Sequence, residues 1–213
     1  MDRVFIFLYK ADLKIFKQLK PKKEEIIICA DSGIKLARKL WYKPKKLILI
    51  GDLDSVENSD VEWCNKNNFE IIKYPENKDK TDGELVIEYD CKNFDTDTRK
   101  IVVGGITDRI DHTLGNISAI IPYIKEDHKF EFHIEKENIF ITSKSILLRS
   151  KKNNKISLMP IERVLEVKTR GLKWELENEN IELYSTRTLR NEAIKEKLTI
   201  EFKKGVLMII ETW

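Results

Sequence analysis

The sequence has few cysteines, and their spacing does not fit a metal site or a disulfide framework. Cys29, Cys64 and Cys91 are odd in number and far apart, and no C-x-x-C pair occurs. This spacing excludes a zinc site built on paired cysteines and argues against stabilisation by disulfides. We therefore expect three reduced, buried thiols.

Long hydrophobic runs are also missing. The longest runs, such as residues 26–30 and 206–210, are far shorter than the ~18 apolar residues of a membrane-spanning helix. The run at residues 4–9 is too short for the core of a signal peptide and has no small-residue cleavage site after it. We expect no membrane partner and a cytoplasmic location.

Charge of one sign is not in excess. The 213 residues include 39 basic and 36 acidic side chains, a net charge of +3. Domains that bind nucleic acids usually concentrate basic residues on one face, so no nucleic-acid partner is expected. Runs rich in Ile, Leu and Val are spread along the whole chain and exclude intrinsic disorder. A chain of this size can bury a sufficient core without disulfides or a structural metal.

The first ~125 residues alternate between short apolar runs and longer amphipathic segments. The runs rich in Ile and Val predict buried strands at residues 4–9, 26–30, 47–50, 70–74 and 101–103. The segments between and after them predict helices at residues 12–19, 32–41, 56–67, 81–92 and 113–125. This alternation predicts a mostly parallel α/β sheet with helices on both faces.

The pattern changes after about Asp127. Residues 130–134 and 198–202 alternate apolar and polar side chains, which is typical of antiparallel strands. A turn at residues 203–205 predicts that strands 198–202 and 206–210 form a hairpin. We therefore predict a mostly parallel α/β domain over residues 1–127 and a small antiparallel β-sandwich over residues 128–213.

Four polar clusters follow predicted parallel strands or the loops after them, at residues 30–33, 51–55, 78–82 and 104–112. The carboxyl ends of parallel strands meet at one edge of a sheet, where α/β proteins bind ligands. That edge would gather carboxylates, glycines and basic side chains, a composition that suits Mg²⁺ and a polyphosphate. No P-loop motif is present, so several loops would have to hold the phosphates.

Each cluster also has a simpler explanation. Asp31-Ser32 and Asp54-Ser55 could cap the helices that follow them, and Thr81 and Glu84 could form a capping box. His112 is more simply explained as a structural histidine than as a catalytic one. Helix capping alone does not require the extra carboxylates and cations found in all four clusters, which favours a shared site.

Taken together, the motifs resemble those of the thiamine pyrophosphokinase family. They read A-D-S-G at 30–33, L-I-G-D-L-D-S at 49–55, K-D-K-T-D-G-E-L at 78–85, G-G-I-T-D-R-I-D-H-T-L-G-N at 104–116 and G-L-K-W-E-L at 171–176. Their order and spacing hold over almost the whole chain. The resemblance implies that the α/β domain (residues 1–127) is a nucleotide-binding catalytic domain that holds ATP and Mg²⁺, and that the β-sandwich (residues 128–213) binds thiamine. The implied activity is transfer of the pyrophosphoryl group of ATP to thiamine.

The resemblance also implies roles for particular residues. It places Mg²⁺ on Asp52, Asp54 and Asp82, with Asp79 close by, and makes Asp79 or Asp111 the candidate acceptor of the thiamine proton. It places Asp31, Ser32, Lys80, Thr81 and Arg109 around the nucleotide. Thiamine would stack on Trp174, near Asn191, in a pocket shared across a homodimer. From spacing alone, Trp174 would instead be a core residue.

Two departures from the family pattern stand out. The family's first motif usually reads Asp-Gly-Gly, and Ser32 takes the place of the first glycine here. A Ser-Asn pair often contacts the aminopyrimidine near the C-terminus, and the aligned pair here is Arg190-Asn191. Asn191 would be retained, and either Arg190 or Ser185 would stand in for the serine.

Two other functions are open to the sequence. Asp52-Leu53-Asp54-Ser55-Val56 also fits the D-x-D-x-[TV] signature of haloacid-dehalogenase-like phosphatases, with Asp52 as a covalent nucleophile. That signature normally lies on the first strand, whereas here it follows the third. A non-catalytic thiamine or nucleotide sensor on the same scaffold would be expected to lose part of the acidic set, which is complete here.

Overall fold

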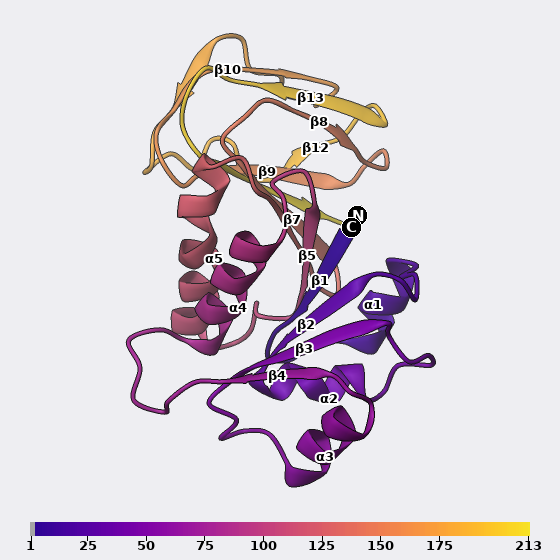
Figure 1. The fold of residues 1–213 in the computed structure, drawn as a ribbon. Helices are drawn as coiled ribbons and strands as arrows, with labels where there is room; N and C mark the ends of the chain where they lie inside the picture. Colours follow the sequence, from indigo (N-terminus) through magenta and orange to yellow (C-terminus); the bar gives the residue numbers. More distant parts are fainter. Residues whose placement is uncertain (1–2) are drawn as a thin grey trace.

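A computed structural model describes residues 3–213. Two β-sheets form its framework, with helices on both faces of the larger sheet (Figure 1). The helical segments are α1 (Leu13–Gln18), a 3₁₀ turn η1 (Asp31–Gly33), α2 (Ile34–Ala37), α3 (Asn58–Lys66), α4 (Asp82–Asn93) and α5 (Ile110–Lys125). The first seven strands are β1 (Arg3–Phe7), β2 (Ile26–Ala30), β3 (Lys46–Gly51), β4 (Glu70–Lys73), β5 (Arg99–Val103), β6 (Lys129–His133) and β7 (Glu137–Thr142). The others are β8 (Ile146–Arg149), β9 (Lys155–Pro160), β10 (Val164–Arg170), β11 (Glu179–Ile181), β12 (Asn191–Glu192), β13 (Lys197–Glu201) and β14 (Leu207–Thr212).

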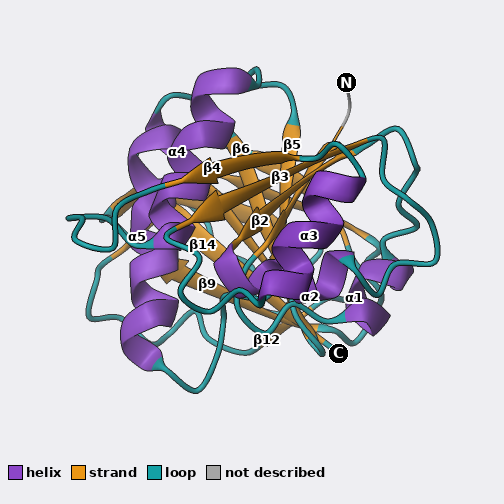
Figure 2. Cartoon of the chain, turned by 60° about the horizontal axis from the view of Figure 1, so that its bottom comes forward, coloured by secondary structure: helices purple, strands orange, loops and turns teal. Residues whose placement is uncertain are grey.

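The parallel part of the large sheet has the strand order β6-β5-β1-β2-β3-β4. Its central strands are runs of Ile, Val, Leu and Phe, because both of their faces are covered. Helices α4 and α5 cover one face, and α1, α2 and α3 cover the other (Figure 2). The predicted parallel α/β arrangement is confirmed.

Most predicted elements lie within a few residues of the observed ones, and two helices differ at their ends. Helix α2 stops at Ala37 and is preceded by the 3₁₀ turn, so it is shorter than predicted. Helix α5 starts at Ile110, three residues before the predicted start. The predicted cap at Thr81 is present, since its hydroxyl accepts the Glu84 N–H at 3.2 Å.

The large sheet does not end at the parallel strands. Strand β6 pairs in parallel with β5 and antiparallel with β7, and the sheet continues through β14 and β9 to β12. The expectation that residues 130–134 form only antiparallel pairs is therefore wrong. Alternating polarity shows which side chains face the core, and it carries no information on the direction of the neighbouring strand.

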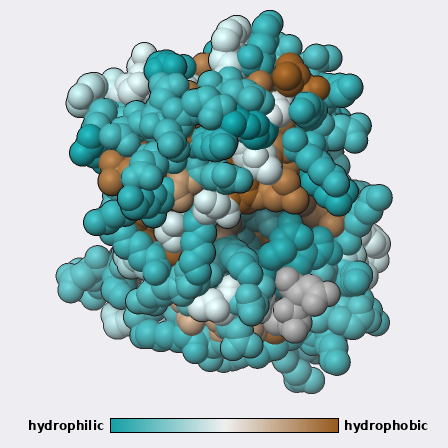
Figure 3. Space-filling model, turned by 90° about the horizontal axis from the view of Figure 1, so that it is seen from above, coloured by the Kyte–Doolittle hydropathy of each residue, from teal (hydrophilic) through white to brown (hydrophobic). Residues whose placement is uncertain are grey.

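The predicted antiparallel sandwich is present. A four-stranded sheet with the order β11-β10-β13-β8 faces the β7-β14-β9 part of the large sheet. Apolar side chains from both sheets, including Ile156, Val167, Leu198 and Ile209, form the core between them. Seen from this end, the surface is mostly hydrophilic, with hydrophobic residues visible near its centre (Figure 3).

The predicted hairpin at residues 198–210 is wrong. Strand β13 belongs to the small sheet and β14 to the large one, so the turn between them carries the chain across the sandwich. Gly205 makes this crossing possible: its φ is +121°, and a Cβ there would lie 2.4 Å from the Arg163 carbonyl oxygen. Both strands have the same period, so the sequence pattern cannot show which sheet each one joins.

Among residues 3–213, no helix is both long and apolar enough to span a bilayer. Cys29 and Cys64 are buried, as predicted, and Cys91 is partly buried; all three are free thiols.

A buried ion pair links α4 to β5 at the opposite end of the sheet from the polar clusters. Asp90 and Lys100 are both fully buried, and their charged atoms lie 3.6 Å apart. The Lys100 ammonium also donates to the carbonyl oxygens of Asp95 (2.9 Å) and Thr98 (3.1 Å). Burial raises the pKa of Asp90 to about 7, although the charge of Lys100 opposes the shift.

We expect Lys100→Met to lower the free energy of unfolding by about 3–5 kcal/mol at pH 8, because Asp90 loses its counter-charge. Since its pKa is raised, the folded Asp90 carboxyl keeps a proton that the unfolded one releases above pH ~4. The raised pKa of Asp90 therefore stabilises the folded state at low pH, and this contribution is lost as the pH rises from about 4 to about 7. Without the charge of Lys100 the folded pKa of Asp90 rises further, so the loss continues to higher pH. Urea unfolding should therefore show a smaller effect of the substitution at pH 5 than at pH 8.

Lys129→Met is the matched control, because it removes an exposed partner of Asp97. It should leave stability unchanged at both pH values. Equal losses at pH 5 and pH 8 for Lys100→Met would contradict the coupling to Asp90.

Candidate active site

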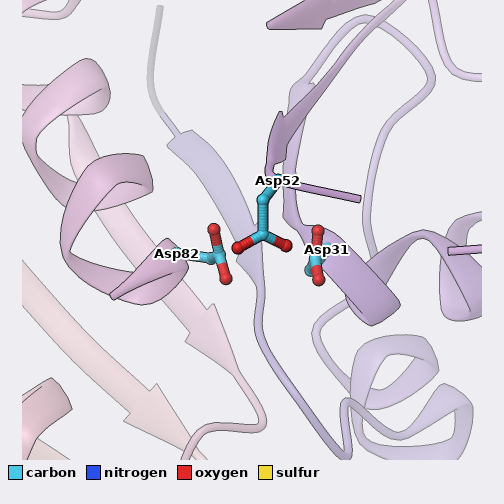
Figure 4. Close-up of side chains that lie close together, drawn as sticks. All are labelled: Asp31, Asp52 and Asp82. Atoms are coloured by element: carbon cyan, nitrogen blue, oxygen red, sulfur yellow. The ribbon is translucent and has the colours of Figure 1, made fainter. Parts of the chain in front are cut away.

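Three carboxylates from separate parts of the chain come together at the carboxyl edge of the parallel strands. Asp31 directly follows β2, Asp52 directly follows β3, and Asp82 is the first residue of α4. Their closest oxygens all lie within 4.8 Å of one another, and the three side chains converge (Figure 4). Because β2 and β3 are neighbours and α4 packs against both, the fold itself brings this group together. We call Asp31, Asp52 and Asp82 the carboxylate cluster.

Asp31 is the most buried member of the carboxylate cluster. Its φ of +45° is left-handed, a conformation that Asp tolerates better than most residues. Its carboxylate accepts the Leu53 N–H at 3.0 Å and the Ser55 hydroxyl at 2.8 Å. Burial raises the pKa of Asp31 to about 6, the Asp82 charge adds to the rise, and the Ser55 hydrogen bond opposes it.

A lysine lies between the other two members. The Lys78 ammonium donates to Asp52 and lies 3.1 Å from Asp82 Oδ1. This hydrogen bond lowers the pKa of Asp52, and burial opposes the shift. Burial alone would lower the pKa of Lys78, but the bonds to Asp52 and Asp82 raise it overall. Asp82 Oδ1 is buried and receives no well-aligned hydrogen bond from the described part of the chain.

Gly51 leaves the space into which the carboxylates converge. A Cβ at this position would lie 2.2 Å from Asp31 Oδ1 and 3.1 Å from Asp82 Oδ1. A side chain would therefore occupy the centre of the carboxylate cluster. This explains why glycine precedes Asp52 in the G-D-x-D-S motif.

The other residues predicted in the first three motifs are not members of the carboxylate cluster. One of them contacts it, and the others are exposed or bind elsewhere. Asp54 is exposed, and its backbone N–H donates to Asp52 Oδ1 at 3.2 Å. Asp79 is exposed on the loop before α4. Lys80 binds Glu88 Oε2 at 2.6 Å, Thr81 caps α4, and Ser32 is half-buried in the 3₁₀ turn.

The fourth motif forms the start of α5. Arg109 is its N-cap residue, and its guanidinium donates to Asp111 Oδ2 at 3.0 Å. Both side chains are mostly exposed, so they are free to meet a ligand at this end of the helix. Within residues 3–213, neither side chain forms a hydrogen bond or an ion pair with the carboxylate cluster.

The two residues predicted to bind substrate lie together in the β-sandwich. Trp174 is 59% exposed, which is unlike a core residue. The buried Asn191 side chain holds the Trp174 backbone on both sides, accepting its N–H at 3.2 Å and donating to its carbonyl oxygen at 2.6 Å. Asn191 therefore positions Trp174. Arg190 is exposed and Ser185 is partly exposed.

Two members of this site have positions that sequence reasoning misses. The sequence predicts a nucleotide contact for Asp31 and does not predict that its oxygens lie with those of Asp52 and Asp82. The signal that could reveal this is its position directly after β2, next to β3 in the sheet. Lys78 belongs to the K-D-x-T-D motif without a predicted role, because its contacts depend on how the loop before α4 folds.

Comparisons with known proteins agree along the length of the chain. The family model described as the thiamin pyrophosphokinase catalytic domain matches residues 16–132. The model of the thiamin pyrophosphokinase vitamin B1 binding domain matches residues 133–207. The chain belongs to the thiamine pyrophosphokinase family.

Individual relatives agree with this family. Thiamine pyrophosphokinase of Bacillus subtilis (strain 168) is 30% identical over 167 residues, 76% of each protein. Thiamine pyrophosphokinase 1 of Arabidopsis thaliana is 22% identical and covers 98% of this chain and 86% of its own length.

Solved structures show the same fold. The Bacillus subtilis crystal structure superposes with a TM-score of 0.84 at 22% identity, covering 99% of both chains. The Candida albicans enzyme reaches 0.82 at 17% identity, covering 100% of this chain and 89% of its own. Membership of this family does not favour the phosphatase or the sensor that the sequence left open.

Proposed function

We propose that this protein transfers the pyrophosphoryl group of ATP to the hydroxyl of thiamine, giving thiamine diphosphate and AMP. The carboxylate cluster is the observation that carries the proposal, since it lies at the ligand-binding edge of an α/β sheet. The match to a vitamin B1 binding domain supports thiamine as the acceptor, and the match to a pyrophosphokinase catalytic domain supports pyrophosphoryl transfer.

The carboxylate cluster fits Mg²⁺ in the chemistry of its donor atoms. Mg²⁺ prefers oxygen ligands and is usually held by a few carboxylates together with phosphates and water. Three converging carboxylates, the buried Asp82 Oδ1 and the space over Gly51 match this requirement. Asp31, Asp52 and Asp82 would hold the ion, and Asp54 beside them stays a predicted ligand. When bound, Mg²⁺ neutralises charge on the phosphates and orients them.

The other polar residues at this edge would position the reacting groups. Thiamine would attack the β-phosphorus with AMP leaving, a reaction in which the protein supplies mainly positioning and charge. Arg109, exposed at the start of α5, would meet phosphate, and Lys80 and Thr81 belong to the loop that leads to Asp82. Asp79 and Asp111 remain the candidates to accept the hydroxyl proton.

Trp174 is proposed as the thiamine platform. Its exposed indole can stack on the aminopyrimidine and attract the thiazolium cation. The hollow beside it encloses only about 70 Å³, far below the ~300–1,000 Å³ of typical ligand pockets. A second surface is therefore needed to enclose thiamine.

A second copy of the chain is the proposed source of that surface. Large apolar side chains of the β-sandwich are exposed, among them Leu189, which lines the same hollow as Trp174, and Tyr184, which is 86% exposed. Ile110 and Leu114 are exposed at the start of α5, beside Arg109. In a symmetric dimer, the exposed apolar side chains of the β-sandwich of one subunit would pack against the α/β domain of the other. A monomer that is fully active at nanomolar concentration would exclude this dimer.

A coupled assay for AMP release tests the function itself. The purified protein should release AMP only when thiamine, ATP and Mg²⁺ are all present, with thiamine diphosphate formed in equal amount. A protein labelled by [γ-³²P]ATP, or AMP release that ignores thiamine, would contradict direct transfer.

We expect Trp174→Ala to raise the KM for thiamine about 5- to 30-fold while the KM for ATP changes little. The loss corresponds to stacking and cation–π attraction worth about 1–2 kcal/mol, at 1.4 kcal/mol per tenfold. Steady-state kinetics with each substrate varied in turn measures both constants.

Trp213→Ala is the control, because Trp213 is also half-exposed and lies outside the proposed pocket. It should leave both constants unchanged. An unchanged thiamine KM in Trp174→Ala would show that thiamine binds elsewhere.

A further inference from the structure

We propose that Lys78 is a built-in counter-cation of the carboxylate cluster, which releases Asp52 and Asp82 when Mg²⁺ binds and then pairs with the polyphosphate. The inference rests on the proposed Mg²⁺ site and assigns a role to a residue that this site does not include. It predicts that removing the Lys78 charge strengthens the binding of metal alone and weakens the binding of metal with nucleotide.

The contacts of Lys78 carry the first part of the proposal. Its ammonium donates to Asp52 and lies 3.1 Å from Asp82 Oδ1, so it bridges two of the three carboxylates. The side chain is only 12% exposed, although it comes from a loop between β4 and α4. Without it, three carboxylates would face one another with no cation in contact among the described residues.

The neighbouring lysine shows that this placement is specific. Lys80 lies on the same loop, but its ammonium binds Glu88 on α4 and its side chain is 41% exposed. Lys78 therefore directs its charge into the carboxylate cluster, and Lys80 directs its charge away from it.

Mg²⁺ and the Lys78 ammonium compete for the same oxygens. A divalent ion held by Asp52 and Asp82 would lie within a few ångströms of the ammonium, where like charges repel strongly. The ammonium must then leave, and its long flexible side chain lets it do so without moving the backbone. The phosphates that arrive with the metal are the nearest new anions, and a lysine serves well as a point charge for phosphate.

The first experiment measures binding of the metal alone. Isothermal titration with Mn²⁺, in the absence of nucleotide, should show about tenfold tighter binding to Lys78→Met than to wild type, because the competing charge is gone. Lys78→Arg keeps the charge and should bind Mn²⁺ within about twofold of wild type.

The second experiment adds a nucleotide that cannot react. α,β-Methylene-ATP with Mg²⁺ should bind Lys78→Met about tenfold more weakly than wild type, because the phosphate partner is lost. Lys92→Met is the matched control for charge, since Lys92 lies in the last turn of α4 and binds Glu88. It should alter neither titration.

The outcomes separate this inference from the proposed function. If neither wild type nor Lys78→Met binds Mn²⁺, or if Asp52→Asn binds it as wild type does, the proposed metal site is wrong. If wild type binds Mn²⁺ but Lys78→Met weakens both titrations, Lys78 is a structural support and the exchange is excluded. Circular dichroism of each variant identifies loss of binding that results from misfolding.

Discussion

Asp52→Asn is expected to lower the rate of pyrophosphoryl transfer by about 1,000-fold or more while the protein stays folded. The substitution keeps the size of the side chain and removes the charge at the centre of the carboxylate cluster. A metal that stabilises charge in the transition state is worth several kcal/mol, and each 1.36 kcal/mol is a factor of ten in rate. The AMP-release assay and a thermal unfolding curve measure the two properties. Asp54→Asn is expected to lose activity as well, since Asp54 is a further predicted ligand.

The control for this experiment is Asp97→Asn. Asp97 is exposed and paired with Lys129, and it precedes β5, at the end of the parallel strands opposite to the carboxylate cluster. It should retain full activity. Turnover within about twofold of wild type in both Asp52→Asn and Asp54→Asn would exclude the carboxylates as the metal site.

Gly51→Ala is expected to lower activity by about 100-fold or more through one added methyl group. The new Cβ would lie 2.2 Å from Asp31 Oδ1, a separation that atoms do not adopt, so Asp31 or the β3 backbone must move. A displacement of about 1 Å in a positioned site is enough for a 100-fold loss. Metal binding should weaken in parallel, which titration with Mn²⁺ measures.

Gly115→Ala is a control with the same chemical change. Gly115 lies in α5, and an added Cβ would have nothing within 4 Å of it, so alanine fits there. It should stabilise the protein by about 0.5–1 kcal/mol, because alanine favours helix over glycine. Equal activity in the two variants would show that the space over Gly51 has no role in the site.

Much of the fold could be predicted because the buried strands are short and rich in Ile and Val. The run 26–30 is fully buried and matches β2 in both bounds. The same reasoning could not place residues 198–210, since strands of either sheet in a sandwich alternate in the same way. The chain crosses between the two sheets at Gly205 because a side chain there would collide with the Arg163 carbonyl oxygen, and this contact is known only from the structure.

The candidate site could be predicted in part for a similar reason. Motif spacing puts Asp52 and Asp82 at one edge, because both follow strands or loops of the parallel sheet. It cannot show that Asp31 turns toward them, since this depends on its left-handed φ and on hydrogen bonds from Leu53 and Ser55. Nor can it show that Lys78 and Lys80, two residues apart, point to different partners.

The boundary between the two family domains falls at residue 132, inside β6. Strand β6 is hydrogen-bonded on one side to β5 and on the other to β7, in the middle of the ten-stranded sheet. A hinge at that point would have to break two backbone ladders at once. Within the chain, the edge that carries the carboxylate cluster and the Trp174 surface are therefore joined through one continuous sheet. Because this sheet is continuous, the two domains of one chain cannot rotate against each other. Any closure around the substrates must therefore come from loops such as residues 74–81.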